Sequence, residues 1–366
     1  MPEATKILHL VAPDGNWEPF AHIAGLAAAL REHGFSSAIT APDHSRLWEL
    51  AEAVGVEAIE YTLERSLNPL RWRELGKFVT ETGAGIVHVH DGGAAAQLSR
   101  ATMFMSNMRV VTTRYDLRTP IAGAEFGSGV GAVLCPSFAM AEAFKQRKAP
   151  EDKLHVVLNG VSLAMADRAG EERDSIRTRF RDQYCPEKEK PLFIVNMSPL
   201  DETGHHADII EAMPEIMAVL PQTHLFIMGE GSQRQELERQ VKITALEKDI
   251  TFLEPDKAFH RLLAGSDLYV APARDDVSGF MVQAAMASGR AVVLRKSGCY
   301  AELAEDGKTA VFADGDGAVA FREAMLGLLE NRSRREHIGR LAKAQAAKAF
   351  NMSELAGRVA EIYRQI

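Results

Sequence analysis

The stretch that decides the fold reads Asp267-Leu-Tyr-Val-Ala-Pro272, continues through Ser278-Gly-Phe280 and Ala285-Met-Ala-Ser-Gly289, and ends in Ala291-Val-Val293. Its pattern predicts a short apolar strand, a loop rich in turn residues, a helix and a second apolar strand. The same alternation of apolar runs and helical segments extends through most of the 366 residues. It is typical of βα units around a parallel sheet.

Two series of these units are expected, separated by the polar stretch 167–190, which carries no strand signal. The fold class is therefore α/β, with two Rossmann-like lobes facing across a cleft and ligands bound at the carboxyl ends of the strands. We expect an N-terminal lobe over 1–165, a linker over 166–190, a C-terminal lobe over 191–345 and a terminal helix over 346–366 that packs back on the first lobe. The strands are expected at 6–11, 37–40, 58–61, 86–89, 109–113, 132–135 and 155–158, and then at 192–196, 224–228, 250–252, 268–271, 291–294 and 309–312.

Composition excludes several classes of protein. With 46% hydrophobic and 25% charged residues the chain is typical of a globular protein, and a net charge of −8 gives no basic surface for nucleic acid. Three widely separated cysteines indicate neither a disulfide framework nor a metal site. Without a signal-peptide pattern or a membrane-spanning run, we expect a cytoplasmic protein whose membrane contact is at most peripheral, at the inner face.

Four ordered segments resemble the family-four retaining glycosyltransferases with the GT-B fold. Leu158-Asn-Gly-Val-Ser162 is similar to the Asn-Gly-Val-Asp linker of that family, and Gly229-Glu-Gly-Ser232 is similar to its Gly-x-Gly-Pro turn. The block from Asp267 to Val293 resembles the donor site, and Ser297-Gly-Cys-Tyr-Ala-Glu302 lies where the family has a Gly-Gly-x-x-Glu loop. The resemblance covers nearly the whole chain, from Ile7 to Tyr363.

The resemblance implies transfer of a sugar from a nucleotide-diphosphate donor to a glycan or lipid-linked acceptor, with retention, in cell-envelope polysaccharide or lipopolysaccharide synthesis. The first lobe would bind the acceptor and the second the donor. The nucleotide sugar is a substrate, so no cofactor is expected, and no metal is required. The implied catalytic residues are His90, Tyr115 and Asp276, and the implied donor-binding residues are Gly15, Gly229, Gly231, Arg274, Ser278, Gly279, Phe280, Arg295 and Lys296.

Several positions depart from the family pattern. The two Glu residues of the family, spaced by seven residues, align with Asp276 and Ala284, and the Arg and Lys that clamp the diphosphate align with Met197 and Thr203. A methyl group cannot accept a hydrogen bond from a ribose, and neither Met nor Thr can neutralise a diphosphate.

Two interpretations of these departures remain open. In the first, Arg274 and the pair Arg295-Lys296 replace the missing cations and form a relocated clamp for the diphosphate. If these three residues are ordinary surface charges, they do not replace the clamp. In the second, the chain is a non-catalytic GT-B protein that acts as a binding or scaffold subunit. A nucleotide-sugar epimerase on the same architecture fits the terminal blocks less well. Gly229 and Gly231 have two readings as well, a phosphate-binding turn or a plain strand-to-helix turn.

In the first lobe, Gly15 stands where the family has a Gly-rich phosphate loop, although a helix cap at Asn16 explains the segment equally. His88 and His90 share one face of a strand. They are either satisfied histidines packed against a helix or, for His90, a residue of the cleft, which is the interpretation we favour. Tyr115 holds the place of a family His near the reacting centre.

Two further features of the first lobe are ambiguous. Arg114 or Arg118 could bind an acidic acceptor or a phosphate, but an ion pair with Asp116 is a simpler explanation. The segment 67–79 is basic and amphipathic, with Trp72 among its aromatic residues. It is either a solvated face with the aromatic side chains in the core, which is favoured, or a surface that rests on an anionic membrane.

Overall fold

The computed structural model describes residues 5–12, 17, 19–63, 66–104, 108–117, 120–256, 258–274 and 276–366. The chain divides into two compact units. Unit 1 contains Met1–Gly160 and Met352–Ile366, and unit 2 contains Val161–Asn351. Gly15, which we expected beside a donor phosphate, lies outside the described residues.

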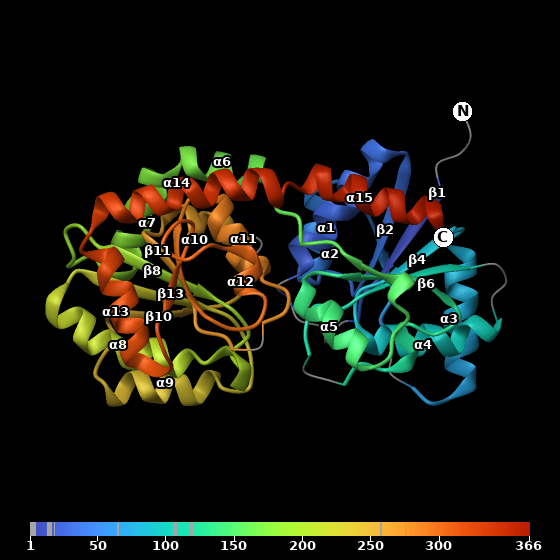
Figure 1. The fold of residues 1–366 in the computed structure, drawn as a ribbon, viewed down its shortest axis with the longest axis horizontal. Helices are drawn as coiled ribbons and strands as arrows, with labels where there is room; N and C mark the ends of the chain where they lie inside the picture. The colour runs from blue at the N-terminus through green and yellow to red at the C-terminus, as the bar shows by residue number, and fades with distance from the viewer. Residues whose placement is uncertain are drawn as a thin grey trace. The chain divides into compact units, whose positions relative to one another are not determined.

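Unit 1 is built on a seven-stranded parallel sheet with the order β3-β2-β1-β4-β5-β6-β7 (Figure 1). Strand β4 is buried at all four positions, as expected where helices cover both faces of a parallel sheet. All seven expected strands are present, with ends that differ by a few residues. They are β1 (Thr5–Leu10), β2 (Phe35–Ala41), β3 (Glu57–Glu60), β4 (Ile86–Val89), β5 (Arg109–Thr113), β6 (Val130–Cys135) and β7 (Leu154–Val156).

The helices of unit 1 begin and end at residues with clear local signals. Helix α1 runs into the 3-10 turn Leu30–His33 and ends at Gly34, whose φ of 84° is left-handed. Glycine takes this conformation without steric cost, so the predicted stop is confirmed. The helices are α1 (Phe20–Ala29), α2 (Arg46–Ala53), α3 (Pro69–Glu81), α4 (Gly92–Ala101), α5 (Phe138–Gln146) and α15 (Met352–Gln365).

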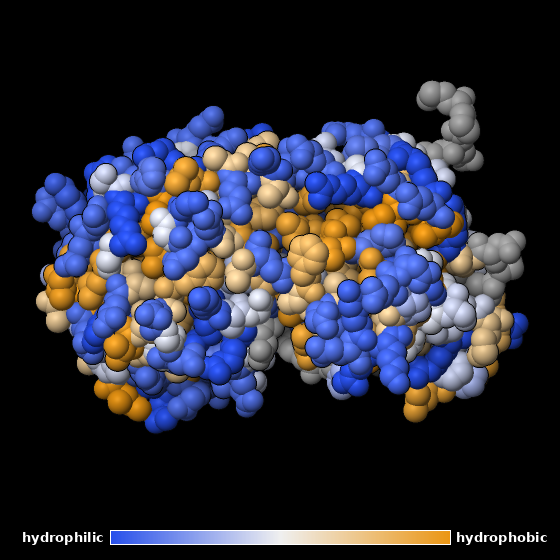
Figure 2. All heavy atoms as spheres, viewed as in Figure 1, coloured by the Kyte–Doolittle hydropathy of each residue, from blue (hydrophilic) through white to orange (hydrophobic). Residues whose placement is uncertain are grey.

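Helix α15 comes from the end of the chain and completes the core of unit 1. Its buried residues, among them Val359 and Tyr363, share one apolar cluster with Leu26 of α1 and Phe35 of β2. In Figure 2 hydrophilic side chains cover the outer side of this helix and apolar ones lie beneath it. The helix begins at Met352 and not at 346, because residues 346–349 end the preceding helix, which belongs to unit 2.

Unit 2 has a six-stranded parallel sheet with the order β10-β9-β8-β11-β12-β13. The six expected strands are all present, again with ends that differ by a few residues. They are β8 (Leu192–Met197), β9 (Thr223–Met228), β10 (Ile250–Leu253), β11 (Leu268–Ala271), β12 (Ala291–Arg295) and β13 (Val311–Ala313). The helices are α6 (Leu163–Glu171), α7 (Arg173–Tyr184), α8 (His206–Val219), α9 (Arg234–Ile243), α10 (Phe259–Gly265), α11 (Phe280–Ala287), α12 (Tyr300–Leu303), α13 (Gly317–Leu329) and α14 (Arg332–Ala349).

The polar stretch that we expected to be a linker is helical and belongs to unit 2. Helices α6 and α7 cover most of it, and both pack against α10. Ile176 is buried together with Ala169 and Ala264 in a small apolar cluster. The stretch lacks a strand signal because it forms helices with one narrow apolar side, so polarity alone did not mark a boundary.

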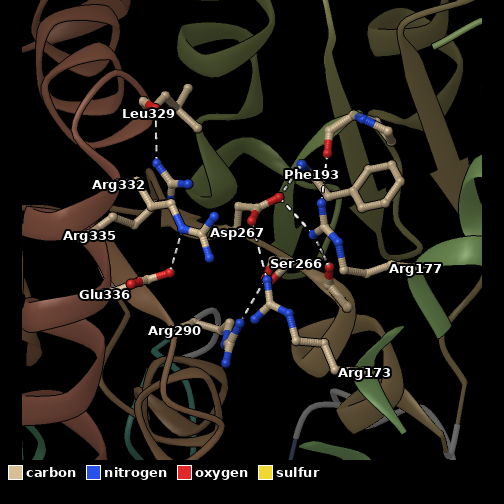
Figure 3. A network of polar contacts seen from close by, with 12 residues as sticks. Arg173, Arg177, Phe193, Ser266, Asp267, Arg290, Leu329, Arg332, Arg335 and Glu336 are labelled. Atoms are coloured by element: carbon tan, nitrogen blue, oxygen red, sulfur yellow. Dashed lines mark hydrogen bonds and ion pairs between the residues drawn. The ribbon is translucent and has the colours of Figure 1, made fainter. Parts of the chain in front are cut away.

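Ion pairs anchor α7 to the sheet of unit 2 (Figure 3). The Asp267 carboxylate accepts hydrogen bonds from Arg173 at 3.2 Å, from Arg177 at 2.8 Å and from the Phe193 amide at 2.9 Å. Arg177 also donates to the carbonyls of Gly265 and Pro191, both at 2.7 Å. The Asp267 carboxylate before β11 therefore connects α7 to β8, and Arg177 connects α7 to the end of α10.

None of the described helices combines the length and apolar character needed to cross a membrane.

Candidate functional site

Three loops follow the carboxyl ends of neighbouring strands in unit 2, and hydrogen bonds join them. They come after β8, β11 and β12. The Arg274 amide donates to the Thr203 carbonyl at 3.3 Å, and the Cys299 amide donates to the Asp276 carbonyl at 2.9 Å. Open α/β sheets bind their ligands at this edge, so the three loops form the candidate donor site.

Asp276 organises the loop before α11. Its Oδ1 accepts hydrogen bonds from the amides of Ser278 at 2.8 Å and Gly279 at 2.9 Å. Burial raises the pKa of the Asp276 carboxyl, and the hydrogen bonds from Gly279, Ser278 and Tyr300 oppose that rise. The Asp276 carboxyl group therefore stabilises the conformation of this loop through its hydrogen bonds to the backbone.

Three predicted donor contacts beside Asp276 have packing roles. Gly279 has a φ of 63°, and a Cβ there would lie 2.3 Å from the Leu303 side chain, so glycine is required. Ser278 and Phe280 are buried, and the Phe280 ring lies 6.1 Å from the ring of Phe259. These residues shape the start of α11 from within the core.

The three candidate cations have different environments. Arg295 is only 3% exposed; it forms ion pairs with Asp208 and Asp316 and donates to the Pro272 carbonyl at 2.7 Å. Arg295 is therefore not the surface charge of the one interpretation, and as part of a relocated clamp its charge is already balanced by two carboxylates.

The other two cations are more accessible. Arg274 lies 3.1 Å from Asp316, and its side chain is 48% exposed. Lys296 is exposed and makes no ion pair within the described part of the chain. Of the three cations, Arg274 and Lys296 are thus the two whose charged groups are accessible to a ligand.

Gly229 and Gly231 allow the turn after β9 to pack closely on the loop after β8. A Cβ on Gly229 would lie 2.2 Å from the Ser198 carbonyl oxygen, and one on Gly231 would lie 2.3 Å from the Leu200 carbonyl oxygen. The Leu200 amide donates to the Glu230 carbonyl at 2.9 Å, which fixes this approach. Backbone packing explains both glycines without a bound phosphate.

The departures from the family pattern lie at the same edge of the sheet. Met197 is fully buried at the end of β8, and Ala284 is 6% exposed in α11, a helix buried at every position. Thr203 is exposed, and its hydroxyl donates to Asp201 at 2.6 Å. Met197 and Thr203 supply no cation for a diphosphate and Ala284 supplies no carboxylate for a ribose, as the sequence indicated.

In unit 1, His90 and Tyr115 belong to a buried hydrogen-bonded network. His90 Nδ1 lies 3.1 Å from the Tyr115 hydroxyl, and His90 Nε2 lies 2.9 Å from His9 Nδ1. His88 lies 2.7 Å from the Thr113 hydroxyl and 2.6 Å from the Tyr363 hydroxyl.

His90 is 3% exposed and Tyr115 is 5% exposed. Tyr363, which bonds His88, belongs to helix α15. This environment fits the interpretation of His88 and His90 as satisfied histidines packed against a helix. It does not fit the interpretation that we favoured, in which His90 is a residue of the cleft.

Burial keeps the histidines of this network uncharged at neutral pH. It lowers the pKa of His9 to about 3 and that of His22 to about 4. The pKa values of His88 and His90 are also lowered, mainly by burial and further by the neighbouring histidines. Burial raises the pKa of Tyr115 far above its usual value. Near neutral pH these groups exchange hydrogen bonds and carry no charge.

Three of these histidines form a cluster with metal-ligand geometry. Nitrogen atoms of His9, His88 and His90 lie within 4.8 Å of one another. His9 Nε2 has no hydrogen-bond partner among the described residues, but the nitrogens of His88 and His90 are bonded to hydroxyl groups or to His9. A metal ion would have to replace these bonds, and the sequence-based expectation that no metal is needed stays a prediction.

Sequence reasoning missed several residues of this network. His9 lies directly opposite His88 in the register of β1 and β4, and His22 Nδ1 accepts a hydrogen bond from the Gly160 amide at 3.0 Å. The signal available was a histidine at position 9, within the first predicted strand.

Arg114 has a different partner from the one we expected. It is 3% exposed, pairs with Glu125 at 2.9 Å and donates to the backbone carbonyl of Asp116 at 2.6 Å. Burial raises the pKa of Glu125, and the bond from the Ala122 amide and the charge of Arg114 oppose that rise. Arg114 is therefore a structural residue. Arg118 lies outside the described residues.

Comparison with known proteins identifies the family. A model of the glycosyl transferases group 1 matches residues 176–345, and a model of glycosyltransferase family 4 matches residues 21–165. The chain belongs to these glycosyltransferases. The two matched regions fall almost wholly in unit 2 and unit 1, respectively.

Solved structures show that this glycosyltransferase has the GT-B fold. HepE from Anabaena, in complex with UDP-glucose, aligns with a TM-score of 0.84 at 18% identity over 99% of this chain and all of that chain. A glycosyltransferase from Rickettsia africae aligns with a TM-score of 0.80 at 16% identity. Two Rossmann-like sheets are thus confirmed as the architecture.

Characterised relatives match part of the glycosyltransferase. A sulfoquinovosyl transferase from Arabidopsis thaliana is 27% identical over 190 residues, which are 49% of this chain and 36% of the relative. A GDP-mannose-dependent alpha-(1-6)-phosphatidylinositol monomannoside mannosyltransferase from Mycolicibacterium smegmatis is 27% identical over 205 residues, 54% of this chain and 53% of the relative. The match thus spans about half or less of these relatives.

Proposed function

We propose that this chain transfers a sugar from a nucleotide-diphosphate donor to a glycan or lipid-linked acceptor, with retention of configuration, at the cytoplasmic side of a cell envelope. The observation that carries the proposal is the match of glycosyltransferase models to both units. The name of one similar protein includes GDP-mannose, and a structure of another, HepE, is a complex with UDP-glucose, which supports a nucleotide sugar as the donor. In this proposal the donor is a substrate, and neither a cofactor nor a metal takes part.

The proposed mechanism depends mainly on positioning and on positive charge. Arg274 and Lys296 lie on joined loops and would stabilise the diphosphate as the sugar leaves, when its negative charge grows. Asp276 would hold sugar hydroxyls in addition to its hydrogen bonds with Ser278, Gly279 and Tyr300. His90 and Tyr115 are buried, so in this proposal they position the strand ends that face the acceptor.

A non-catalytic binding or scaffold role is the alternative. The observation that favours it is the environment of Arg295, whose charge is balanced by Asp208 and Asp316, together with the missing cations at Met197 and Thr203. A protein with this role would bind a nucleotide or glycan without turnover.

The test is single-turnover release of nucleoside diphosphate from a panel of nucleotide sugars, with a membrane extract as acceptor. We expect Arg274→Ala or Lys296→Ala to lower turnover on the order of 10²-fold, and to weaken donor binding in calorimetry much less. Lys248→Ala is the matched control, because this exposed lysine precedes β10 at the opposite edge of the same sheet. If the folded wild type releases no diphosphate above background, the scaffold role replaces the enzyme.

A further inference from the structure

Four large apolar side chains are exposed together on one side of unit 1. Leu67 and Leu70 are 78% and 64% exposed at the start of α3, and Met103 and Phe104 are 70% and 46% exposed in the 3-10 turn after α4. This turn packs against both α3 and α4. We call these four residues the apolar tip. Single exposed apolar residues are common, but an exposed group of them marks an interaction site.

Basic side chains lie on α3 and α4, the two helices next to the apolar tip. Arg71 is 52% exposed and Lys77 is 75% exposed, and both carry a Glu partner on α3; Arg73 is exposed and forms no ion pair within the described residues. Arg100 on α4 adds another positive charge. With Glu74 and Glu81 included, α3 and Arg100 carry a net charge of +2 in a chain of net charge −8.

The apolar tip stands on a rigid base. The Trp72 indole N–H donates to the Ser66 carbonyl at 2.9 Å, and the Arg100 guanidinium lies 5.6 Å from the centre of the Trp72 ring. Asn68 caps α3 by accepting a hydrogen bond from the Leu70 amide at 3.0 Å. The half-buried Trp72 thus joins α3 to α4, while the leucines on either side of Asn68 remain outside the core.

A cavity of about 530 Å³ lies next to the tip. Its lining includes Ser99 and Arg100 at the end of α4 and Thr102 in the turn that contains Met103 and Phe104. Hydroxyl groups and a guanidinium suit a phosphate-bearing headgroup.

We propose that the apolar tip and its basic surroundings dock unit 1 on the surface of an anionic membrane. Leu67, Leu70, Met103 and Phe104 enter the boundary between headgroups and acyl chains, and Arg71, Arg73 and Arg100 attract the anionic lipids. Stable binding of this kind takes both an apolar and an electrostatic contribution, and this surface carries both.

This inference extends the proposed function, because a lipid-linked acceptor would be met on that membrane. The biological role of this docking rests on the proposed function. The vesicle-binding measurement does not, because binding requires no turnover. Failure of one is therefore distinguishable from failure of the other.

The experiment measures sedimentation of the full chain with lipid vesicles. One set of vesicles is phosphatidylcholine alone, and the other contains about 30% phosphatidylglycerol, which gives a strong negative surface potential. We expect binding to the anionic vesicles that is at least about tenfold stronger than to the neutral ones. The double variant Leu70→Glu/Phe104→Glu should lose at least about tenfold in partitioning, and Arg73→Gln should lose about fivefold, the scale for one basic residue at an anionic surface.

Ile243→Glu is the matched control, since Ile243 is an equally exposed apolar residue, 69% accessible, on α9 of unit 2. It should bind vesicles as the wild type does, and unfolding midpoints should show that all variants fold.

Three results would overturn the proposal. They are wild-type protein that stays in solution with both vesicle types, a Leu70→Glu/Phe104→Glu variant that binds as the wild type does, and a dimer in light scattering that this variant dissociates. The last result would assign the apolar tip to a second copy of the chain.

Discussion

Arg295 and Lys296 are neighbours in sequence with opposite environments. The Arg295 guanidinium is buried between Asp208 of α8 and Asp316 before α13, and it lies 5.2 Å from the centre of the Phe321 ring. Lys296 is exposed on the following loop. Side chains alternate across a strand, so a shift of one residue at the end of β12 moves a cation from the core to the surface.

We predict that Arg295→Ala destabilises unit 2 by about 3 kcal/mol, because it leaves Asp208 partly buried without its counter-charge. Lys296→Ala should change the free energy of unfolding by less than about 0.5 kcal/mol, as expected for a surface residue. Urea unfolding followed by fluorescence measures both. Equal unfolding midpoints for the two variants would contradict the assignment of Arg295 as a structural residue.

At the scale of secondary-structure elements, helix α7 depends on a contact with a residue far away in sequence. Ile176 is its one buried residue, and the half-buried rings of Phe180 and Tyr184 lie 5.7 Å and 5.2 Å from the ring of Phe226. Arg173 and Arg177 lie one turn apart and both reach Asp267, which also binds the Phe193 amide (Figure 3). The position of α7 therefore depends on a charged contact as well as on apolar packing.

We predict that Asp267→Asn costs about 3 kcal/mol of stability in unit 2, since it leaves two partly buried guanidinium groups facing a neutral amide. Proteolysis should then cut within Arg173–Tyr184 faster than in the wild type. The control is Asp182→Asn, because Asp182 lies on the same helix but is 58% exposed and pairs with the neighbouring Arg181. If Asp182→Asn has as large an effect as Asp267→Asn, helix propensity holds α7 and the contact with Asp267 does not.

For the whole molecule, buried neutral histidines make stability depend on pH. Among the described residues of unit 1, four histidines are buried, at positions 9, 22, 88 and 90, and each has a lowered pKa. In unit 2, burial lowers the pKa of His206 and of His224 to about 4. In the unfolded chain a histidine takes up a proton near pH 6.5. Below that pH the unfolded state binds more protons than the folded state, so the free energy of unfolding falls as the pH falls.

We predict a steep loss of unit 1 stability from pH 6.5 towards pH 4. Each such histidine contributes about 1.4 kcal/mol per pH unit, and four together contribute about 5 kcal/mol per pH unit. Thermal unfolding between pH 7.5 and pH 4.5 measures this slope. His9→Gln should reduce it by about a quarter, whereas His337→Gln, an exposed histidine on α14, should leave it unchanged. A stability that is flat over this range would show that the buried histidines are protonated in the folded state.

The sequence by itself determined the order of the strands along the chain, the parallel α/β class and the family. Apolar runs that end in turn residues depend on neighbours a few positions apart, so each strand from β1 to β13 was predictable within a few residues. The stop at Gly34 was predictable for the same reason, because the left-handed conformation belongs to one residue. The departures at Met197, Thr203 and Ala284 could also be recognised from the sequence, since each is a local difference from the family pattern.

The tertiary structure decided which of the candidate site residues face inward. His9 and His90 are 81 positions apart and share a hydrogen bond because the sheet places β1 beside β4. Arg295 meets Asp208, 87 positions away, because α8 begins and β12 ends at the same edge of unit 2. The pairing of distant charges depends on strand order and on helix packing, and a local pattern carries neither. For that reason the sequence marked Arg295 and His90 as candidates, and only the fold showed that both are buried.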